Sequence, residues 1–175
     1  LPKDIRAFVH RAGELGCGDA VAFLDEVDAV NRRRRGRAAE LVREQVGGDL
    51  TGARVCVLGA AFKPASDDVR DAPALDVADR LRAAGADVVV FDPMAMDNAR
   101  RSHPQLSYAD SVLEAATGAD AVALLTEWEH FRALDPRWLG RLVAHRRVVD
   151  ARHALDVEAW RRAGWAYMAP GRPVR

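Results

Sequence analysis

The stretch VCVLGAAFKPASDDVRDAP, residues 55–73, decides how the sequence is expected to fold. Four apolar residues lead into Gly59, a polar loop follows, and Pro73 ends the stretch, where it favours the first turn of a helix. A buried strand, a loop and a helix in this order are typical of the first unit of a nucleotide-binding α/β domain. Such a unit usually has a glycine-rich phosphate loop, but here two alanines and Phe62 follow Gly59. Close backbone approach to a pyrophosphate is therefore disfavoured, and side chains have to make any ligand contacts.

Continuous apolar runs alternate with amphipathic segments from this stretch to the end of the chain. The expected strands are Arg54–Phe62, Asp87–Phe91, Ala121–Leu125, Arg147–Asp150 and Trp165–Met168. The expected helices are Ala74–Ala84, Asp110–Ala116, Pro136–Val143 and Val157–Ala163, with a surface excursion over Arg101–Ser107. Apolar strands that alternate with helices predict a parallel sheet covered on both faces, which is a doubly wound α/β domain.

A long helix is expected before this domain, over residues 19–46. It follows Gly16 and Gly18 and ends at the Gly47–Gly48 pair. At 1.5 Å per residue it would extend about 40 Å, which is longer than a small domain needs. Gly36 and the neighbouring arginines interrupt its apolar stripe and allow a kink or break near residue 36. The chain therefore divides into a helical region, 1–50, and an α/β domain, 51–175.

The charges of the chain are balanced, with 26 Lys plus Arg and 26 Asp plus Glu among 175 residues. This balance indicates no nucleic-acid or membrane partner. Arg32–Arg35, with Arg37, form a dense basic run, but four consecutive residues point all around a helix. We interpret them as solvated charge and as salt bridges to a partner helix. No apolar run approaches the roughly 18 residues of a membrane span.

The two cysteines, Cys17 and Cys56, are expected to be reduced in a cytoplasmic protein. The five histidines show no metal-ligand spacing, so we predict no metal site. We find no Ser-His-Asp order, and the residues alone indicate no nucleophile. Lys3, Asp4 and Arg6 precede any apolar stretch, so we expect no signal peptide, and since no initiator Met is present we expect a piece of a longer protein.

Two cations of the loop are candidate ligand contacts. Lys63 carries an ammonium on a flexible stem, which is a good point-charge partner for phosphate. Arg70, before the helix, is able to hold an anion bidentately. The alternative is a surface loop whose two cations are solvated and balanced by Asp67, Asp68 and Asp71. The residues alone leave both interpretations open.

Two further residues follow strands at the edge where open α/β sheets bind ligands. Asp92 ends the second strand, where dinucleotide-binding folds have an acid for a ribose hydroxyl. An Asp-Pro pair also opens turns routinely, and we favour that interpretation. Arg152 follows the strand that ends in Asp150 and is a candidate for another anion contact.

Several motifs, taken together and in order, resemble one family. They are LPKD (1–4), VLGAAFKPASDDVRDAPALDVADRLRAAGADVVVFDP (57–93), LLTEWEHFRALDP (124–136), VVDARHALD (148–156) and RRAGWAYMAPGRP (161–173). They resemble the C-terminal half of the UDP-glucose 6-dehydrogenases, within the UDP-glucose/GDP-mannose dehydrogenase family, over essentially the whole chain. The loop pattern FKPxxDDxRxxP is highly specific, and TEWEHF favours the UDP-glucose branch.

The resemblance implies an architecture and its partners. Family members have an NAD-binding Rossmann domain, a long central helix that builds the dimer, and a Rossmann-like domain that binds the UDP part of the substrate. On this basis residues 19–46 form the helix of a homodimer, and the Rossmann-like parallel-sheet domain over 51–175 binds UDP-glucose. The missing glycines then belong to a domain that holds the sugar nucleotide, while NAD has its main site elsewhere.

The resemblance also implies a reaction, the oxidation of UDP-glucose to UDP-glucuronate. The family's cysteine lies in a Gly-Gly-Ser-Cys-x-Pro-Lys-Asp motif and forms a thiohemiacetal and then a thioester, which water hydrolyses. Leu1–Asp4 match the residues after that cysteine, so we expect the nucleophile to lie outside this chain and the chain alone to be inactive. Neither Cys17 nor Cys56 matches its position.

The resemblance assigns roles to six residues. Asp4 matches the aspartate that helps to activate water, and Lys3 and Arg70 match contacts to NAD. The nucleotide-sugar contacts are Phe62, Lys63 and Arg152.

Two positions depart from the family pattern, which puts only the detailed loop geometry in doubt. Asp71–Ala72 stand where Glu-Ser is usual, and His153 stands where Asn is frequent. Two alternatives stay open: a non-catalytic, dimerising nucleotide-binding module, and a dehydrogenase of another nucleotide sugar such as UDP-N-acetylmannosamine or GDP-mannose.

Overall fold

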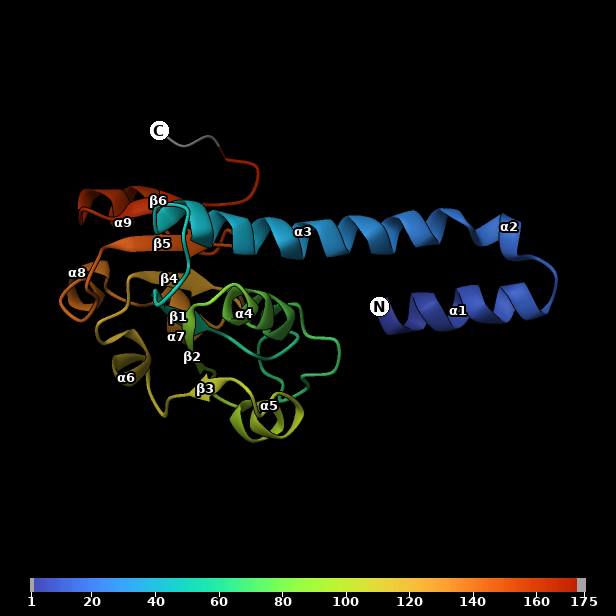
Figure 1. Cartoon of the computed structure of the whole chain (residues 1–175), viewed down its shortest axis with the longest axis horizontal. Helices are drawn as coiled ribbons and strands as arrows, with labels where there is room; N and C mark the ends of the chain where they lie inside the picture. Colours follow the sequence, from blue (N-terminus) through green and yellow to red (C-terminus); the bar gives the residue numbers. More distant parts are fainter. Residues whose placement is uncertain (1, 173–175) are drawn as a thin grey trace.

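A computed structural model describes residues 2–172, and of Pro2 and Lys3 it describes the backbone alone. Figure 1 shows an α/β domain from which a helical arm extends to one side. The arm consists of α1 (Pro2–Glu14), α2 (Gly18–Val21) and the first part of α3 (Phe23–Gln45). The strands of the domain are β1 (Arg54–Leu58), β2 (Asp87–Phe91), β3 (Ser107–Tyr108), β4 (Ala121–Leu124), β5 (Arg147–Asp150) and β6 (Ala166–Met168). Its helices are α4 (Pro73–Ala83), α5 (Met96–Ser102), α6 (Val112–Ala116), α7 (Glu129–Arg132), α8 (Pro136–Leu139) and α9 (Val157–Arg162).

The six strands form one parallel sheet in the order β3-β2-β1-β4-β5-β6. The chain moves outward from β1 on one side, returns, and moves outward from β4 on the other. Strand order therefore reverses between β1 and β4, which is where ligands bind in folds of this kind. The doubly wound domain predicted from the alternation of apolar strands and helices is confirmed.

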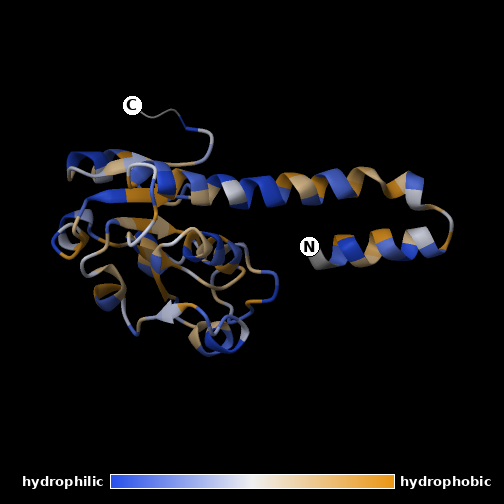
Figure 2. Cartoon of the chain, in the orientation of Figure 1, coloured by the Kyte–Doolittle hydropathy of each residue, from blue (hydrophilic) through white to orange (hydrophobic). Residues whose placement is uncertain are grey.

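The core consists of the apolar runs that predicted the strands. Val55, Val57, Val90, Val122 and Val148 are fully buried, as expected for strands covered on both faces. Figure 2 shows these strands as a largely hydrophobic layer between helices of mixed character.

Most predicted elements exist, but several bounds differ. The predicted bounds of β2 and β5 are confirmed, whereas β1 ends at Leu58, four residues before the predicted end. The excursion predicted over Arg101–Ser107 contains the end of α5 and the start of β3, and α7 was not predicted at all. These missed elements are short, so they carry little hydrophobic periodicity.

The long helix was predicted largely correctly. It runs without interruption through Gly36, so the break considered there is wrong, and the one interruption within the predicted range is the turn residue Ala22 between α2 and α3. Its C-terminal half packs on the sheet through buried Leu41 and Val42. Close to its end, the side-chain amide of Gln45 donates hydrogen bonds to the carbonyls of Val148 (3.3 Å) and Ala166 (2.9 Å). The arm is therefore attached firmly to β5 and β6.

The N-terminal helix α1 was not predicted, and it lies alongside the free half of α3 (Figure 1). Its N-terminus points back toward the domain. This fold-back brings the start of α1 toward the edge of the sheet where the loop after β1 lies.

Gly59 is the residue that lets the chain turn away from β1. Its φ is +109°, and a Cβ there would lie 2.5 Å from Cβ of Thr126, which follows β4. Thr126 in turn donates its hydroxyl to the carbonyl of Ala61 at 2.9 Å. The missing side chain of Gly59 thus lets the ends of β1 and β4 come together at the switch point.

We predict that Gly59→Ala lowers the free energy of unfolding by about 3 kcal/mol, because left-handed backbone strain adds to a steric overlap in a packed site. Urea denaturation of the 175-residue chain measures the effect. Gly118→Ala is the matched control, since Gly118 has φ +71° but an added Cβ there meets nothing within 4 Å. The control should lose only about 1 kcal/mol. Equal losses in the two variants would show that the contact with Thr126 carries no weight.

Candidate functional site

Residues 59–72, which we call the ligand loop, connect β1 to α4 at the carboxyl edge of the sheet. The amide N–H of Phe62 donates to the carbonyl of Asp68 at 2.8 Å, which closes the loop on itself. The side-chain amide of Asn98 on α5 donates to the carbonyl of Asp67 at 2.8 Å and secures its tip. Internal bonds and contacts from neighbouring elements therefore define the loop without any glycine after Gly59.

Asp92, at the end of β2, is a buried anchor for this loop. It is 1% exposed, and its Oδ2 accepts hydrogen bonds from the amides of Ala60 (2.8 Å) and Ala61 (3.0 Å) and from the indole of Trp128 (3.0 Å). Its Oδ1 accepts bonds from the backbone amides at positions 94 (3.0 Å) and 95 (2.9 Å). The interpretation of Asp-Pro as a turn opener is confirmed. A ribose contact is wrong for this residue, because both of its oxygens are occupied.

Asp150, at the end of β5, is a second buried carboxylate that anchors a loop. It is fully buried and accepts hydrogen bonds from the amides of Arg152 (3.0 Å), Ala154 (2.9 Å) and Leu155 (2.9 Å). The hydroxyl of Tyr167 donates to it at 2.8 Å, and burial together with this bond raises the pKa of that phenol. The carboxylate of Asp150 therefore fixes the turn on which Arg152 stands.

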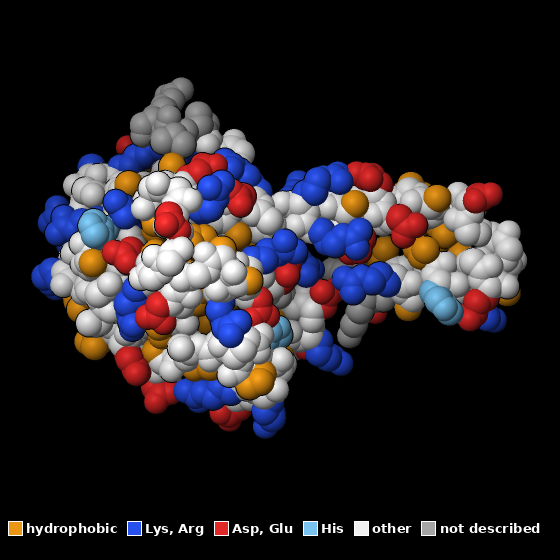
Figure 3. All heavy atoms as spheres, in the orientation of Figure 1, with side chains coloured by type: hydrophobic (Ala, Val, Ile, Leu, Met, Phe, Trp, Pro, Cys, Tyr) orange, Lys and Arg blue, Asp and Glu red, His pale blue; other side chains and the backbone are white. Residues whose placement is uncertain are grey.

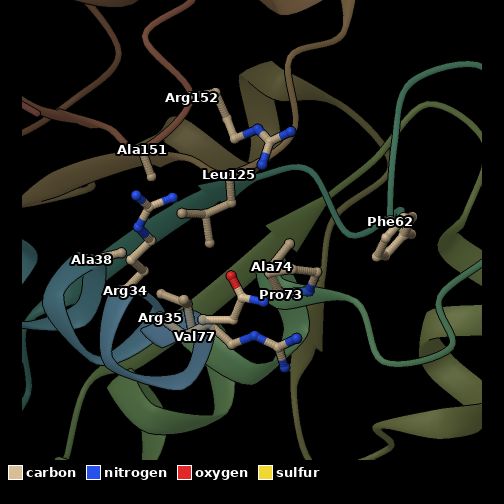
Figure 4. A pocket seen from close by; sticks show the side chains of 11 residues that line it. Arg34, Arg35, Ala38, Phe62, Pro73, Ala74, Val77, Leu125, Ala151 and Arg152 are labelled. Carbon is tan, nitrogen blue, oxygen red and sulfur yellow. The ribbon is translucent and has the colours of Figure 1, made fainter. Parts of the chain in front are cut away.

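A cavity of about 360 Å³ opens at the switch point, between α3 and the start of α4. Its apolar lining comes from Ala38, Phe62, Pro73, Ala74, Val77, Leu125 and Ala151, and its polar lining from Asn31, Arg34, Arg35 and Arg152. In Figure 4, Phe62 lies on one side of this cavity and Arg34 on the other, with Leu125 and Ala74 between them. A cavity with an apolar floor and guanidinium groups at its rim suits a flat base or ribose that carries an anionic group.

Arg152 lies at this rim and is held by Glu127, from the TEWEHF segment. Nε and Nη2 of Arg152 donate to the two carboxylate oxygens at 2.5 and 3.0 Å. Hydrogen bonding from Arg152 lowers the pKa of Glu127, so this carboxylate stays ionised near neutral pH. A guanidinium has five N–H groups, and the remaining three of Arg152 are available to a ligand in the cavity.

The two cations of the ligand loop differ in their surroundings. Lys63 is exposed and makes no hydrogen bond or ion pair with any residue that the structure describes. Arg70 is exposed and pairs bidentately with Asp68, through Nε at 2.8 Å and Nη2 at 2.7 Å, which raises the pKa of Arg70. Both cations are thus exposed, as in the surface-loop interpretation, and Asp68, one of the acids named there, balances Arg70. Arg70 lines a second hollow, shared with Asn98 and Arg101.

The other two predicted site residues lie on α1. Asp4 is exposed in its first turn, and the side chain of Lys3 lies outside the described residues. Two residues further along, Arg6 reaches the carboxylate of Asp71 at 3.1 Å. The helix that carries Asp4 is therefore in direct contact with the end of the ligand loop.

The arginine run has roles that the sequence did not indicate individually. Arg32 pairs with Asp28 and Arg33 with Glu26, both within α3, whereas salt bridges to a partner helix were predicted. Arg34 lines the cavity, and Arg35, with only 11% of its side chain exposed, reaches the domain. Consecutive residues of a helix point about 100° apart, so these arginines were expected to face different directions. The partner that each one meets depends on tertiary contacts.

Cys56 provides no activated thiol. Cys56 is fully buried in β1, and burial raises the pKa of its thiol to about 12. Cys17 is exposed in the turn after α1. Within residues 2–172, no three His, Cys, Asp or Glu side chains gather as metal ligands do, and no helix there has the length and apolarity to cross a membrane.

The comparisons with known proteins agree with this geometry. Residues 56–157, more than half of the chain, match the UDP-glucose/GDP-mannose dehydrogenase family, UDP binding domain. The chain belongs to this family.

Similar proteins in the UDP-glucose/GDP-mannose dehydrogenase family include UDP-glucose 6-dehydrogenases. That of Rhizobium meliloti is 38% identical over 173 residues, and AglM of Haloferax volcanii is 39% identical over 163 residues. These matches cover 99% and 91% of this chain but 39% and 37% of the two relatives. A solved UDP-glucose dehydrogenase from Pyrobaculum islandicum matches with a TM-score of 0.73 and 32% identity, over 95% of this chain and 36% of that one. The chain thus spans under two fifths of the length of these relatives.

We predict that Asp92→Asn lowers the free energy of unfolding by about 3 kcal/mol, because the new NH₂ group must face N–H donors that now bind a carboxylate. Denaturation of the 175-residue chain measures the loss. Asp87→Asn, at the other end of the same strand, is the control. Asp87 is exposed and pairs only with Arg54 at the surface, so this change should cost less than about 1 kcal/mol. Similar losses in both variants would rule out Asp92 as the anchor of the loop.

Proposed function

We propose that this chain is the nucleotide-sugar-binding part of an NAD-dependent UDP-glucose dehydrogenase, which oxidises UDP-glucose to UDP-glucuronate. The observation that carries the proposal is the cation-rimmed cavity at the switch point, formed largely from residues 56–157, which match the UDP binding domain of the family. In this proposal residues 51–175 bind the UDP-sugar and residues 1–50 form the dimerisation region.

The nucleotide has complementary groups in and beside the cavity. The apolar floor and the ring of Phe62 suit the uracil and ribose, and Arg34 and Arg152 offer N–H donors to hydroxyl or phosphate oxygens. The N-terminus of α4, which begins at Pro73, points its dipole toward the same space and favours an anion there. Lys63 adds an exposed ammonium without a local partner among the described residues, which a diphosphate would neutralise.

We infer that NAD binds beside this domain and not in the loop after β1. The loop after β1 lacks the fingerprint glycines, and the oxygens of Asp92 are fully used, so no group is left for an adenosine ribose. Arg70 keeps three N–H groups beyond its pair with Asp68 and is exposed, so it suits a contact with NAD across a cleft, together with Lys3. NAD, when bound, supplies the hydride acceptor for the oxidation.

Asp4 is proposed to help activate the water that releases the product. It lies in the exposed first turn of α1. Cys56 is unsuitable as a nucleophile because burial raises the pKa of its thiol, and Cys17 lies in the turn at the other end of α1. The nucleophilic cysteine therefore belongs to another part of the dehydrogenase, and this chain alone should not oxidise UDP-glucose.

A homodimer through the arm is supported by apolar side chains that the described residues leave uncovered. Phe8, Leu15, Phe23 and Val27 are between 40% and 65% exposed, and all lie on α1, α3 or the turn after α1. In Figure 2 the arm carries hydrophobic segments although it projects from the domain. Exposed apolar residues gathered on one projecting element favour association over solvation.

We predict that Lys63→Ala raises the dissociation constant of UDP-glucose about tenfold in the full dehydrogenase that contains this chain, because one diphosphate contact is lost. Isothermal titration calorimetry measures it, together with turnover of NAD by the wild type. Arg82→Ala removes a cation from the far end of α4, where Arg82 is exposed, and should leave the affinity unchanged. Equal affinities of wild type and Lys63→Ala would contradict the assignment of the loop. Oxidation of UDP-glucose by the chain alone would contradict the assignment of the nucleophile.

We predict that the 175-residue chain is a dimer by light scattering, and that Phe23→Asp makes it monomeric, because a charge cannot be buried unpaired in an apolar interface. Leu113→Asp is the control, since Leu113 is 53% exposed on α6, away from the arm, and should not affect the mass. A monomeric wild type would mean that another part of the dehydrogenase covers the arm.

A further inference from the structure

Asp71 ends the ligand loop next to Arg70, and its carboxylate contacts two helices of the arm. Its Oδ2 accepts a hydrogen bond from Nη2 of Arg6 on α1 at 3.1 Å. Its Oδ1 accepts one from Nη1 of Arg35 on α3 at 3.2 Å. One side chain therefore connects α1, α3 and the ligand loop. Figure 3 shows basic and acidic side chains side by side where the arm meets the domain.

The two arginines have further carboxylate partners. Nη1 of Arg35 lies 3.7 Å from Oδ2 of Asp76 in the first turn of α4, and Nε of Arg6 lies 3.5 Å from Oδ2 of Asp28. Asp28 also pairs with Arg32 at 3.0 Å. The side chains of Arg35 and Asp28 are 11% and 8% exposed. An exposed ion pair contributes little, but a partly buried network with matched charges fixes the groups that it joins.

The backbone conformation at Asp71 allows its charge to be removed without a change of shape. Its φ is +54°, in the left-handed region that Asp and Asn adopt more readily than other residues with a side chain. An Asn at this position therefore keeps both the shape and the turn and removes only the charge. This makes the contribution of the two ion pairs measurable apart from the fold of the loop.

We propose that Asp71 is a positioning residue for the oxidation: its ion pairs with Arg6 and Arg35 hold Asp4 in register with the ligand loop. The inference rests on the proposed function. Asp4 lies only two residues before Arg6 on the same rigid helix, so a displacement of Arg6 displaces Asp4 as well.

The position of Asp4 relative to the ligand loop matters because groups with different roles in one reaction lie on the two sides of the ion-pair network around Asp71. The loop side carries Lys63 and Arg70, which are the proposed contacts to the nucleotide sugar and NAD. The α1 side carries Asp4, the proposed group for water activation. A misplacement of about 1 Å between such groups costs up to about a hundredfold in rate.

In the full dehydrogenase, Asp71→Asn is expected to lower kcat about tenfold while the KM for UDP-glucose changes less than about twofold, since ligand contacts remain and alignment is lost. Arg6→Gln removes the contact between Asp71 and α1 and should also lower kcat, by no more than Asp71→Asn does. The loss in the double variant should be smaller than the product of the two single losses, because both changes remove the Arg6–Asp71 pair. Asp97→Asn, at an exposed carboxylate of α5, is the control and should behave as wild type.

An unchanged kcat in Asp71→Asn would overturn the proposal, and so would losses that multiply in the double variant.

Hydrogen exchange of the 175-residue chain tests the connection without catalysis. Asp71→Asn is expected to speed amide exchange severalfold in both α1 and the ligand loop, and Arg6→Gln to speed it in the loop. Unchanged loop exchange in Arg6→Gln would overturn the coupling. The exchange experiment and the activity assay can fail separately. If exchange changes as expected but the wild-type dehydrogenase does not oxidise UDP-glucose, the proposed function is wrong, and so is the role of Asp71 in that oxidation. The coupling of α1 to the ligand loop would still hold.

Discussion

The carboxylate of Asp92 accepts hydrogen bonds from residues on three segments that meet at the carboxyl edge of the sheet. It receives the amides that follow β1, the amides that follow its own strand, and the indole of Trp128 beyond β4. A buried carboxylate is costly unless each oxygen is satisfied, and here each oxygen has at least two donors. The direction in which the ligand loop leaves the sheet is therefore determined by Asp92 together with Gly59.

Asp150 repeats this solution on the other side of the switch point. The two aspartates end β2 and β5, on either side of the central pair β1 and β4. Each binds backbone amides of a loop that presents a cation, Lys63 in one case and Arg152 in the other. Buried carboxylates hold the backbone while exposed cations stay available to a ligand. This separation lets a domain without phosphate-binding glycines keep a rigid site.

The sequence was sufficient for the parallel sheet, since runs such as Asp87–Phe91 have the length and continuous apolarity of strands buried on both faces. It was insufficient for α1, because a helix that packs only on another helix of an arm has no signature in the domain's own pattern. The loop motif located Phe62, Lys63 and Arg70, but the motif carries no information on Asp71 as a contact between elements. That role depends on Arg6, 65 residues away, and a single sequence does not indicate which distant arginine a given aspartate meets.

The arginine run illustrates how helical geometry separates residues that look alike in sequence. A helix turns by about 100° per residue, so neighbouring side chains face different surroundings. Arg32 and Arg33 meet acids of their own helix, whereas Arg34 faces the cavity and Arg35 the network at Asp71. Arg33 and Glu26 are both exposed, so water screens their pair, whereas Asp28, the partner of Arg32, is buried. The side chain of Arg35 is largely enclosed between α3 and the domain. Within one basic run, Arg35 therefore connects the arm to the ligand loop, and Arg34 lines the cavity. The packing of α3 on the sheet determines which arginine takes which role.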